Sequence, residues 1–119
     1  MNKAQYERLS QFFHGLSSRS RVLLYLLAIG MSSRSIVNMK ITELEALTNV
    51  PADIRELITL IRDDCDVDGL AFVYPNKRKY VPGQLVHILK RACENAGYPA
   101  MGLDGFRVYV TDGKETVIK

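Results

Sequence analysis

The sequence predicts a mainly α-helical fold, of the α+β kind with minimal sheet, that forms a single domain over residues 1–119. Apolar residues recur at helical spacing in several segments, and Ser, Pro and Gly stand where helices would begin and end. Only short runs have the β-branched and aromatic composition of strands. An apolar fraction of 47% in 119 residues is enough to build one hydrophobic core.

Three helices are expected in the first third of the chain. Residues 3–16 place four apolar side chains at helical spacing. Residues 21–29 are apolar nearly all round, so this helix should be the buried centre, and Gly30 should end it. A third helix, over residues 32–39, can begin at a serine cap.

Further helices are expected in the middle of the chain. In residues 41–47 an apolar residue recurs at every third position, which indicates a short helix or turn. Pro51 suits the first turn of a helix, and an apolar stripe follows over residues 54–61. A longer helix is predicted over residues 83–96, with Gly97 as its stop.

Two segments predict strands. Residues 70–74 have strand-like composition and follow an acidic loop, residues 63–69, which lacks the terminal Glu of an EF-hand. A C-terminal hairpin is expected over residues 107–118, because Asp112-Gly113 is a two-residue turn signal between apolar runs.

The charges are unevenly distributed. A formal net charge of +3 permits nucleic-acid binding but does not require it. Acidic residues concentrate in residues 43–68, so one face of the molecule could carry a positive field. The basic residues cluster at Arg19, Arg21 and Arg34, at residues 77–79 and at residues 90–91.

Several classes of protein are excluded. The longest apolar run, residues 22–31, is short of the roughly 20 residues of a membrane-spanning helix, and the first residues lack a signal peptide. Cys65 and Cys93 have no metal or redox spacing, and His14 and His87 lack partner ligands. No phosphate-binding loop, dinucleotide fingerprint or nucleophile elbow occurs. We expect a cytoplasmic protein with reduced thiols, without metal or cofactor.

Five segments together resemble, in their order, the catalytic domain of the tyrosine recombinases (the phage-integrase family). The segment around Gly30-Met31-Ser32 is similar to the point where a buried helix of that family ends in Gly-Leu-Arg. The other four segments are residues 50–57, 70–75, 84–98 and 104–107. The resemblance implies a reduced, truncated version of the recombinase catalytic fold.

The same resemblance implies that the protein is not an enzyme. The first catalytic arginine of the family falls on Ser32, and its histidine falls on Asp104, whose charge would repel a phosphate. The catalytic lysine has no counterpart, because residues 45–49 are too few for the sheet that carries it. The nucleophilic tyrosine would fall beyond the last residue given, which leaves Arg107 as the one match. Because such residues act as a unit, one match cannot support the reaction.

The function predicted from these observations is non-catalytic DNA binding, as a regulator or accessory factor associated with a mobile element. The mobile element is implied by the resemblance alone. DNA would be contacted through its phosphate backbone, without any contact to a membrane. The predicted contact residues are Arg19, Arg21, Lys77, Arg78, Lys79, Lys90 and Arg107.

The sequence leaves alternatives open for the function, for Arg107 and for two tyrosines. The protein could instead be an interaction module that docks a recombinase or forms a homo-oligomer, because a C-terminal hairpin would offer unpaired edges to a partner protein. Arg107 could be a surface arginine paired with Asp104 rather than a phosphate contact. Tyr74 and Tyr80 could stack on the bases of a single strand or simply cover the core.

Overall fold

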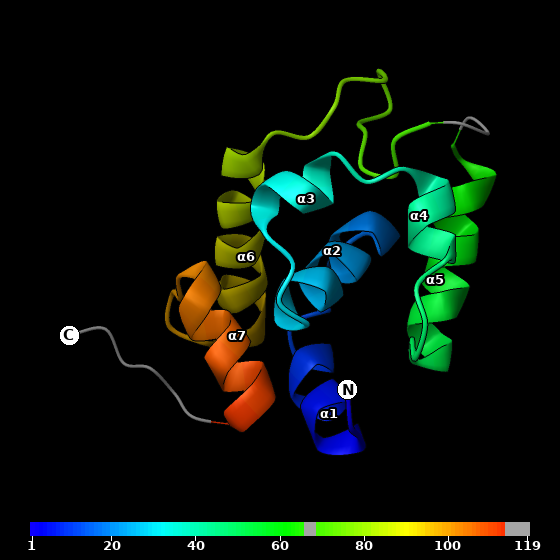
Figure 1. Ribbon diagram of the computed structural model, residues 1–119. Helices are drawn as coiled ribbons and strands as arrows, with labels where there is room; N and C mark the ends of the chain where they lie inside the picture. The colour runs from blue at the N-terminus through cyan, green and yellow to red at the C-terminus, as the bar shows by residue number, and fades with distance from the viewer. Residues whose placement is uncertain (66–68, 114–119) are drawn as a thin grey trace.

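The computed structural model describes residues 1–65 and 69–113, and this part of the chain is mainly helical, as the sequence predicts (Figure 1). Its helices are α1 (Lys3–Ser10), α2 (Ser18–Ala28), α3 (Ser33–Val37), α4 (Ile41–Glu45), α5 (Ala52–Asp63), α6 (Pro82–Ala96) and α7 (Leu103–Asp112). Their buried apolar side chains form one hydrophobic core.

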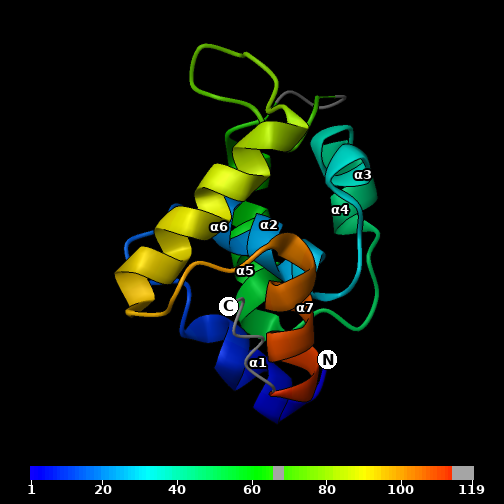
Figure 2. The same cartoon turned by 90° about the vertical axis from the view of Figure 1, so that its left-hand side faces the viewer.

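Helix α2 is the centre of this core, as its composition predicts. Every residue from 22 to 28 is buried. Helix α5 packs on one side of α2, and α6 and α7 pack on the other side (Figures 1 and 2). The helix begins earlier than predicted, because the Ser17 hydroxyl accepts a hydrogen bond from the backbone N–H of Ser20 and caps the first turn.

Helix α1 is shorter than the predicted segment of residues 3–16. It ends at Ser10, whose hydroxyl donates to the carbonyl of Glu7 at 2.8 Å, a local bond that competes with helix continuation. The chain continues in turns, yet the side chains at positions 9, 12, 13 and 16 are all buried as predicted. The apolar pattern therefore identified the buried residues but not the end of the helix.

The predicted starts and stops of the other helices agree well with the structure. The Ser32 hydroxyl accepts from the N–H of Ser35 and caps α3, which ends two residues before the predicted Met39. Helix α5 begins directly after Pro51. Helix α6 ends at Ala96, and Gly97 caps it in the left-handed conformation (φ 77°) that glycine adopts without steric cost.

The predicted strand at residues 70–74 does not form. Leu70 and Val73 make only isolated bridges, to Lys40 and Lys79, and the described residues contain no strand. A ladder needs consecutive paired residues, and here the turn that begins at Pro75 ends the pairing after a single bridge.

The predicted C-terminal hairpin is wrong over the residues that the structure describes. Residues 103–112 form α7, which packs against α1 and α2. Gly113 is not part of a hairpin turn but a left-handed helix cap (φ 71°), and its N–H donates to the Tyr109 carbonyl at 2.8 Å. The other half of the predicted hairpin falls in residues 114–119, outside the described residues.

The hairpin prediction gave β composition too much weight. Residues 108–111 are rich in β-branched and aromatic side chains. The buried positions are Phe106, Tyr109 and Val110, which follow a helical spacing of three and four residues. Burial against α1 and α2 therefore overrides the local strand preference.

Arginine side chains satisfy carbonyl groups at the ends of two helices, α4 and α7. Arg8 donates to the carbonyls of Val110 and Thr111 at the end of α7, at 3.0 and 3.1 Å. Arg55 donates to the Glu45 carbonyl at the end of α4, at 2.9 Å. The last carbonyls of a helix have no partner within it, so these guanidinium groups stabilise both the helix ends and the packing between helices.

Candidate nucleic-acid interface

Residues 77–79 lie on a structured turn that is fixed to the core. Phe72 and Tyr80, at its two ends, are buried, and the Tyr80 N–H donates to the Phe72 carbonyl at 3.1 Å. Inside this pair, the Tyr74 N–H donates to the Arg78 carbonyl at 2.9 Å, and the Lys77 N–H donates to the Tyr74 carbonyl at 2.9 Å. The turn therefore presents its basic residues from a defined backbone.

The turn itself follows known turn chemistry except at one residue. Pro75 stands at the position where its fixed φ suits a turn, and the Asn76 side chain accepts from the Arg78 N–H at 3.0 Å. Lys77 then takes the left-handed conformation, with φ 67°. Glycine or asparagine adopts this conformation more easily than lysine does.

Helix α6 begins directly after the turn and adds two more cations. Leu85 and Leu89 face the core, while Lys90 and Arg91 lie on the exposed side of the helix together with His87. We call the exposed cations of the turn and of α6 the basic surface. It consists of Lys77, Arg78, Lys79, Lys90 and Arg91.

The cations of the basic surface differ in their polar contacts within the protein. Arg78, Lys90 and Arg91 make no side-chain hydrogen bond or ion pair with any described residue. Lys79 donates to the side-chain carbonyl of Asn38, at the end of α3. The cations are thus held on an ordered backbone, and three of them have no partner in the described part of the chain.

The cations of the basic surface are separated along the sequence from most of the acidic residues. Residues 69–93 contain five Lys or Arg residues and no Asp or Glu, whereas residues 43–68 hold eight of the 13 acidic residues. Within residues 43–68, the acidic residues that the structure describes lie on α4, on α5 and at Asp64, directly after α5. Helices α5 and α6 lie on opposite sides of α2 (Figure 1), although Asp64, directly after α5, lines one cavity together with Lys77.

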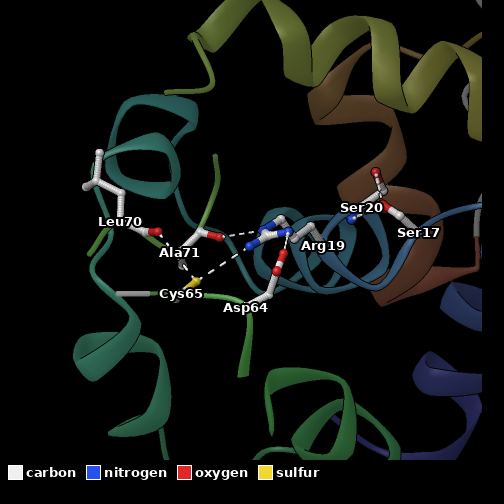
Figure 3. A network of polar contacts seen from close by, with 7 residues as sticks. All are labelled: Ser17, Arg19, Ser20, Asp64, Cys65, Leu70 and Ala71. Carbon is white, nitrogen blue, oxygen red and sulfur yellow. Dashed lines mark hydrogen bonds and ion pairs between the residues drawn. The ribbon is translucent and has the colours of Figure 1, made fainter. Parts of the chain in front are cut away.

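Arg19, a predicted phosphate contact, is instead bonded to other groups of the protein (Figure 3). Its Nε donates to the Ala71 carbonyl at 3.0 Å, and its Nη1 lies 2.9 Å from the Asp64 carboxylate. Its Nη2 donates to the Cys65 sulfur at 3.6 Å. Burial alone would lower the pKa of Arg19, but the bonds to Asp64 and Cys65 outweigh it and raise the pKa. Arg19 therefore links α2 to the chain that follows α5.

Arg21 and Arg107 also lie outside the basic surface, half-buried and bonded to backbone carbonyls. Arg21 donates to the Leu16 carbonyl at 3.1 Å and lies over the ring of Phe13. Arg107 donates to the carbonyls of Leu27 and Met31 at 3.0 and 3.3 Å, where α2 ends.

Arg107 also forms the ion pair with Asp104 that the sequence offers as the alternative to a phosphate contact. Its Nη1 lies 3.5 Å from the carboxylate of Asp104, one turn earlier on α7. Four of the seven predicted contact residues thus share the basic surface, while Arg19, Arg21 and Arg107 hold helices together.

Arg91 is a member of the basic surface that the predicted contact set did not include. Its neighbour Lys90 was included, and both stand in the same basic pair of the sequence. The signal that would have found it is the helical spacing, since the buried positions 85, 89 and 92 leave positions 87, 90 and 91 facing outward.

The two tyrosines that flank the basic turn differ in exposure. Tyr80 is 7% exposed, and burial raises the pKa of its hydroxyl. Tyr74 is only half-buried, with its ring centroid 4.5 Å from that of Tyr80 and the planes inclined by 33°. Tyr80 thus covers the core, as one of the two alternatives states, and Tyr74 lies over it nearer to solvent.

The described residues offer no group of three or more His, Cys, Asp or Glu side chains that could hold a metal ion. None of the helices in residues 1–65 and 69–113 has the length and apolar composition needed to cross a membrane.

The chain matches no protein-family model, no curated protein and no solved structure. The resemblance to tyrosine recombinases, and the association with a mobile element that it implies, therefore depend on the sequence motifs alone.

Proposed function

We propose that the protein binds nucleic acid without catalysing a reaction on it, and that the basic surface contacts the phosphate backbone. DNA is the proposed target, and the role is that of a regulator or accessory factor. The observation that carries the proposal is the concentration of five exposed cations in residues 69–93, a segment that contains no carboxylate. A surface of this kind attracts a polyanion, because each phosphate it neutralises releases a condensed counterion.

The dimensions of the surface suit a nucleic-acid strand. Arg91 lies nine positions after Pro82 on α6, which corresponds to roughly 13 Å along the helix axis. At about 3.4 Å per phosphate along one strand, that length spans on the order of four phosphates.

The backbone at Lys77 gives independent support. A left-handed conformation costs a residue with a side chain roughly 1–2 kcal/mol relative to its usual conformations. Glycine or asparagine would occupy this position at lower cost. Conformational strain of this kind concentrates at functional sites, so a lysine here is consistent with a requirement for its charge.

The proposal does not include catalysis, because the chain lacks most of the catalytic residues that the recombinase resemblance implies. Arg107, the one residue that matches the recombinase motifs, donates to the carbonyls of Leu27 and Met31. Ser32, at the position of the family's first catalytic arginine, instead caps α3. Association with a mobile element stays a prediction from the resemblance. The alternative of a protein-docking module also stays a prediction, and the hairpin edge that motivated it is replaced by α7 in the described residues.

A binding titration with a charge-matched control tests the proposal. Lys90→Glu and Lys3→Glu change the net charge equally, and both lysines are exposed, Lys3 on α1 and Lys90 on α6. We expect Lys90→Glu to weaken binding to a fluorescent random-sequence DNA duplex about ten-fold at low salt. Lys3→Glu should change the affinity much less. Equal losses in the two variants, or no binding of either duplex or single-stranded DNA by the wild type at low salt, would contradict the proposal.

A further inference from the structure

Two cavities lie beside each other along the basic turn and α6, and they share two residues. One cavity, of about 440 Å³, is lined by Asn76, Arg78, Lys79 and Val81 together with Tyr74 and Gln84. The other, of about 270 Å³, is lined by Tyr74 and Gln84 and also by Ser20, Tyr80, His87 and Arg91. We call the two cavities together the Tyr74 groove.

The groove has an aromatic ring at its middle and cations toward both ends. Tyr74 lines both cavities, and Tyr80 supports its ring from the core side at a centroid distance of 4.5 Å. Arg78 and Lys79 belong to one cavity, and Arg91 belongs to the other. The amide of Gln84, which can donate and accept hydrogen bonds, is common to both.

This arrangement matches the chemistry of an unpaired nucleotide. A base has an aromatic face that stacks on tyrosine and a polar edge that an amide can bond, and its phosphates carry negative charge. A base within a duplex cannot present its face, because its neighbours in the stack cover it. The order of cation, aromatic ring and cation along the groove therefore favours a single strand over a duplex.

We propose that the Tyr74 groove binds single-stranded nucleic acid, with one base stacked on Tyr74 and the flanking phosphates held by Lys79 and Arg91. This inference rests on the proposed function, since the phosphate contacts belong to the basic surface. It adds the kind of strand that is bound and the residue that stacks on a base.

The test compares ligands that differ only in their bases. An oligothymidine of about twelve nucleotides and an abasic deoxyribose-phosphate strand of equal length carry the same phosphates. The wild type should bind the oligothymidine at least about five-fold more tightly, the lower end of the contribution of one stacked base. An oligouridine in the same titration shows whether the sugar matters, and tight, base-dependent binding of either strand supports the inference.

Variants at Tyr74 complete a double-mutant cycle with the ligand. Tyr74→Leu keeps an apolar cover over Tyr80 but removes the stacking ring, so it should bind the oligothymidine and the abasic strand with similar affinity. Tyr74→Phe keeps the ring and should behave as the wild type does. Thermal melting of each variant establishes that it is folded, and the comparison of the two strands by the wild type needs no variant at all.

The outcomes separate this inference from the proposed function. If the wild type binds duplex or abasic strand with strong salt dependence but gains nothing from the bases, the groove assignment fails while the proposed function stands. Unchanged oligothymidine affinity in a folded Tyr74→Leu variant would overturn the groove assignment as well. If no nucleic acid binds at low salt, both proposals fail together.

Discussion

The Nε of Arg107 donates a hydrogen bond of 3.0 Å to the carbonyl oxygen of Leu27, and through it α7 closes the C-terminal end of the central helix α2. The same guanidinium reaches the Met31 carbonyl at 3.3 Å. The residue that best matched a catalytic motif in the sequence thus has a structural role that its motif does not reveal.

Replacing Arg107 should lower stability. Arg107→Met keeps much of the aliphatic stem but removes the charged hydrogen bonds to the carbonyls of Leu27 and Met31, at a cost of about 1–3 kcal/mol in the free energy of unfolding. The Leu27 carbonyl keeps its bond from the Gly30 N–H. Urea denaturation followed by circular dichroism measures this cost. Arg34→Ala, at an exposed arginine of α3, is the control and should stay within about 0.5 kcal/mol of the wild type. Equal stability of the two variants would show that the bonds contribute nothing.

Arg19 and Asp64 form an ion pair whose two members should differ in their effect on stability. The Arg19 side chain is 16% exposed and also donates to the Ala71 carbonyl, so Arg19→Ala should cost about 1–3 kcal/mol. The Asp64 side chain is 74% exposed, and Asp64→Ala should cost less than about 1 kcal/mol. Thermal melting of both variants gives the comparison. A larger loss from Asp64→Ala would mean that the ion pair, not the carbonyl bond, is the main contribution.

Lys77→Asn should separate stability from binding. Asparagine adopts the left-handed conformation more readily than lysine, so the variant should be as stable as the wild type or up to about 1 kcal/mol more stable. Its affinity for DNA should nevertheless fall, because one cation of the basic surface is lost. Chemical denaturation and DNA titration of the same sample check both outcomes. A variant that is clearly less stable, or that binds as well as the wild type, contradicts the role given to Lys77.

The two cysteines should differ in reactivity. Cys93 has no exposed surface, and burial raises the pKa of its thiol, so less of the reactive thiolate is present at a given pH. Cys65 is half-buried, beside Arg19. A thiol reagent at neutral pH should therefore label the native protein at Cys65 first. Cys65→Ser should react only after denaturant is added, and rapid labelling of this variant under native conditions would refute the assignment of Cys93 to the core.

The fold was predictable wherever one kind of residue pattern dominated. The continuous apolar run of α2 and the amphipathic pattern of α6, with Pro82 in its first turn and Gly97 directly after it, leave little alternative to a helix. Residues 108–111 were misassigned because their β-branched composition and their helical spacing pointed to different structures. Packing against α1 and α2 decided the conflict, and such contacts cannot be seen in a single sequence.

The candidate site was only partly predictable for a similar reason. Arg78 and Arg107 are the same residue type, and their sequence contexts do not show that one is exposed and the other bonded to α2. A guanidinium serves equally well to bind a phosphate or to close a helix end. The cavity that Tyr74 and Gln84 share also depends on how the turn folds against α6, since ten positions separate them in the sequence.

The salt dependence of DNA binding in Arg91→Ala and Arg107→Met tests the central claim most directly, namely that the basic surface contacts phosphates while the half-buried arginines do not. The slope of log K against log salt concentration should decrease in magnitude by about 0.9 in Arg91→Ala, because one fewer counterion is released. Arg107→Met, measured at a temperature where it is folded, should keep the wild-type slope. An unchanged slope in Arg91→Ala together with a reduced slope in Arg107→Met would contradict the account.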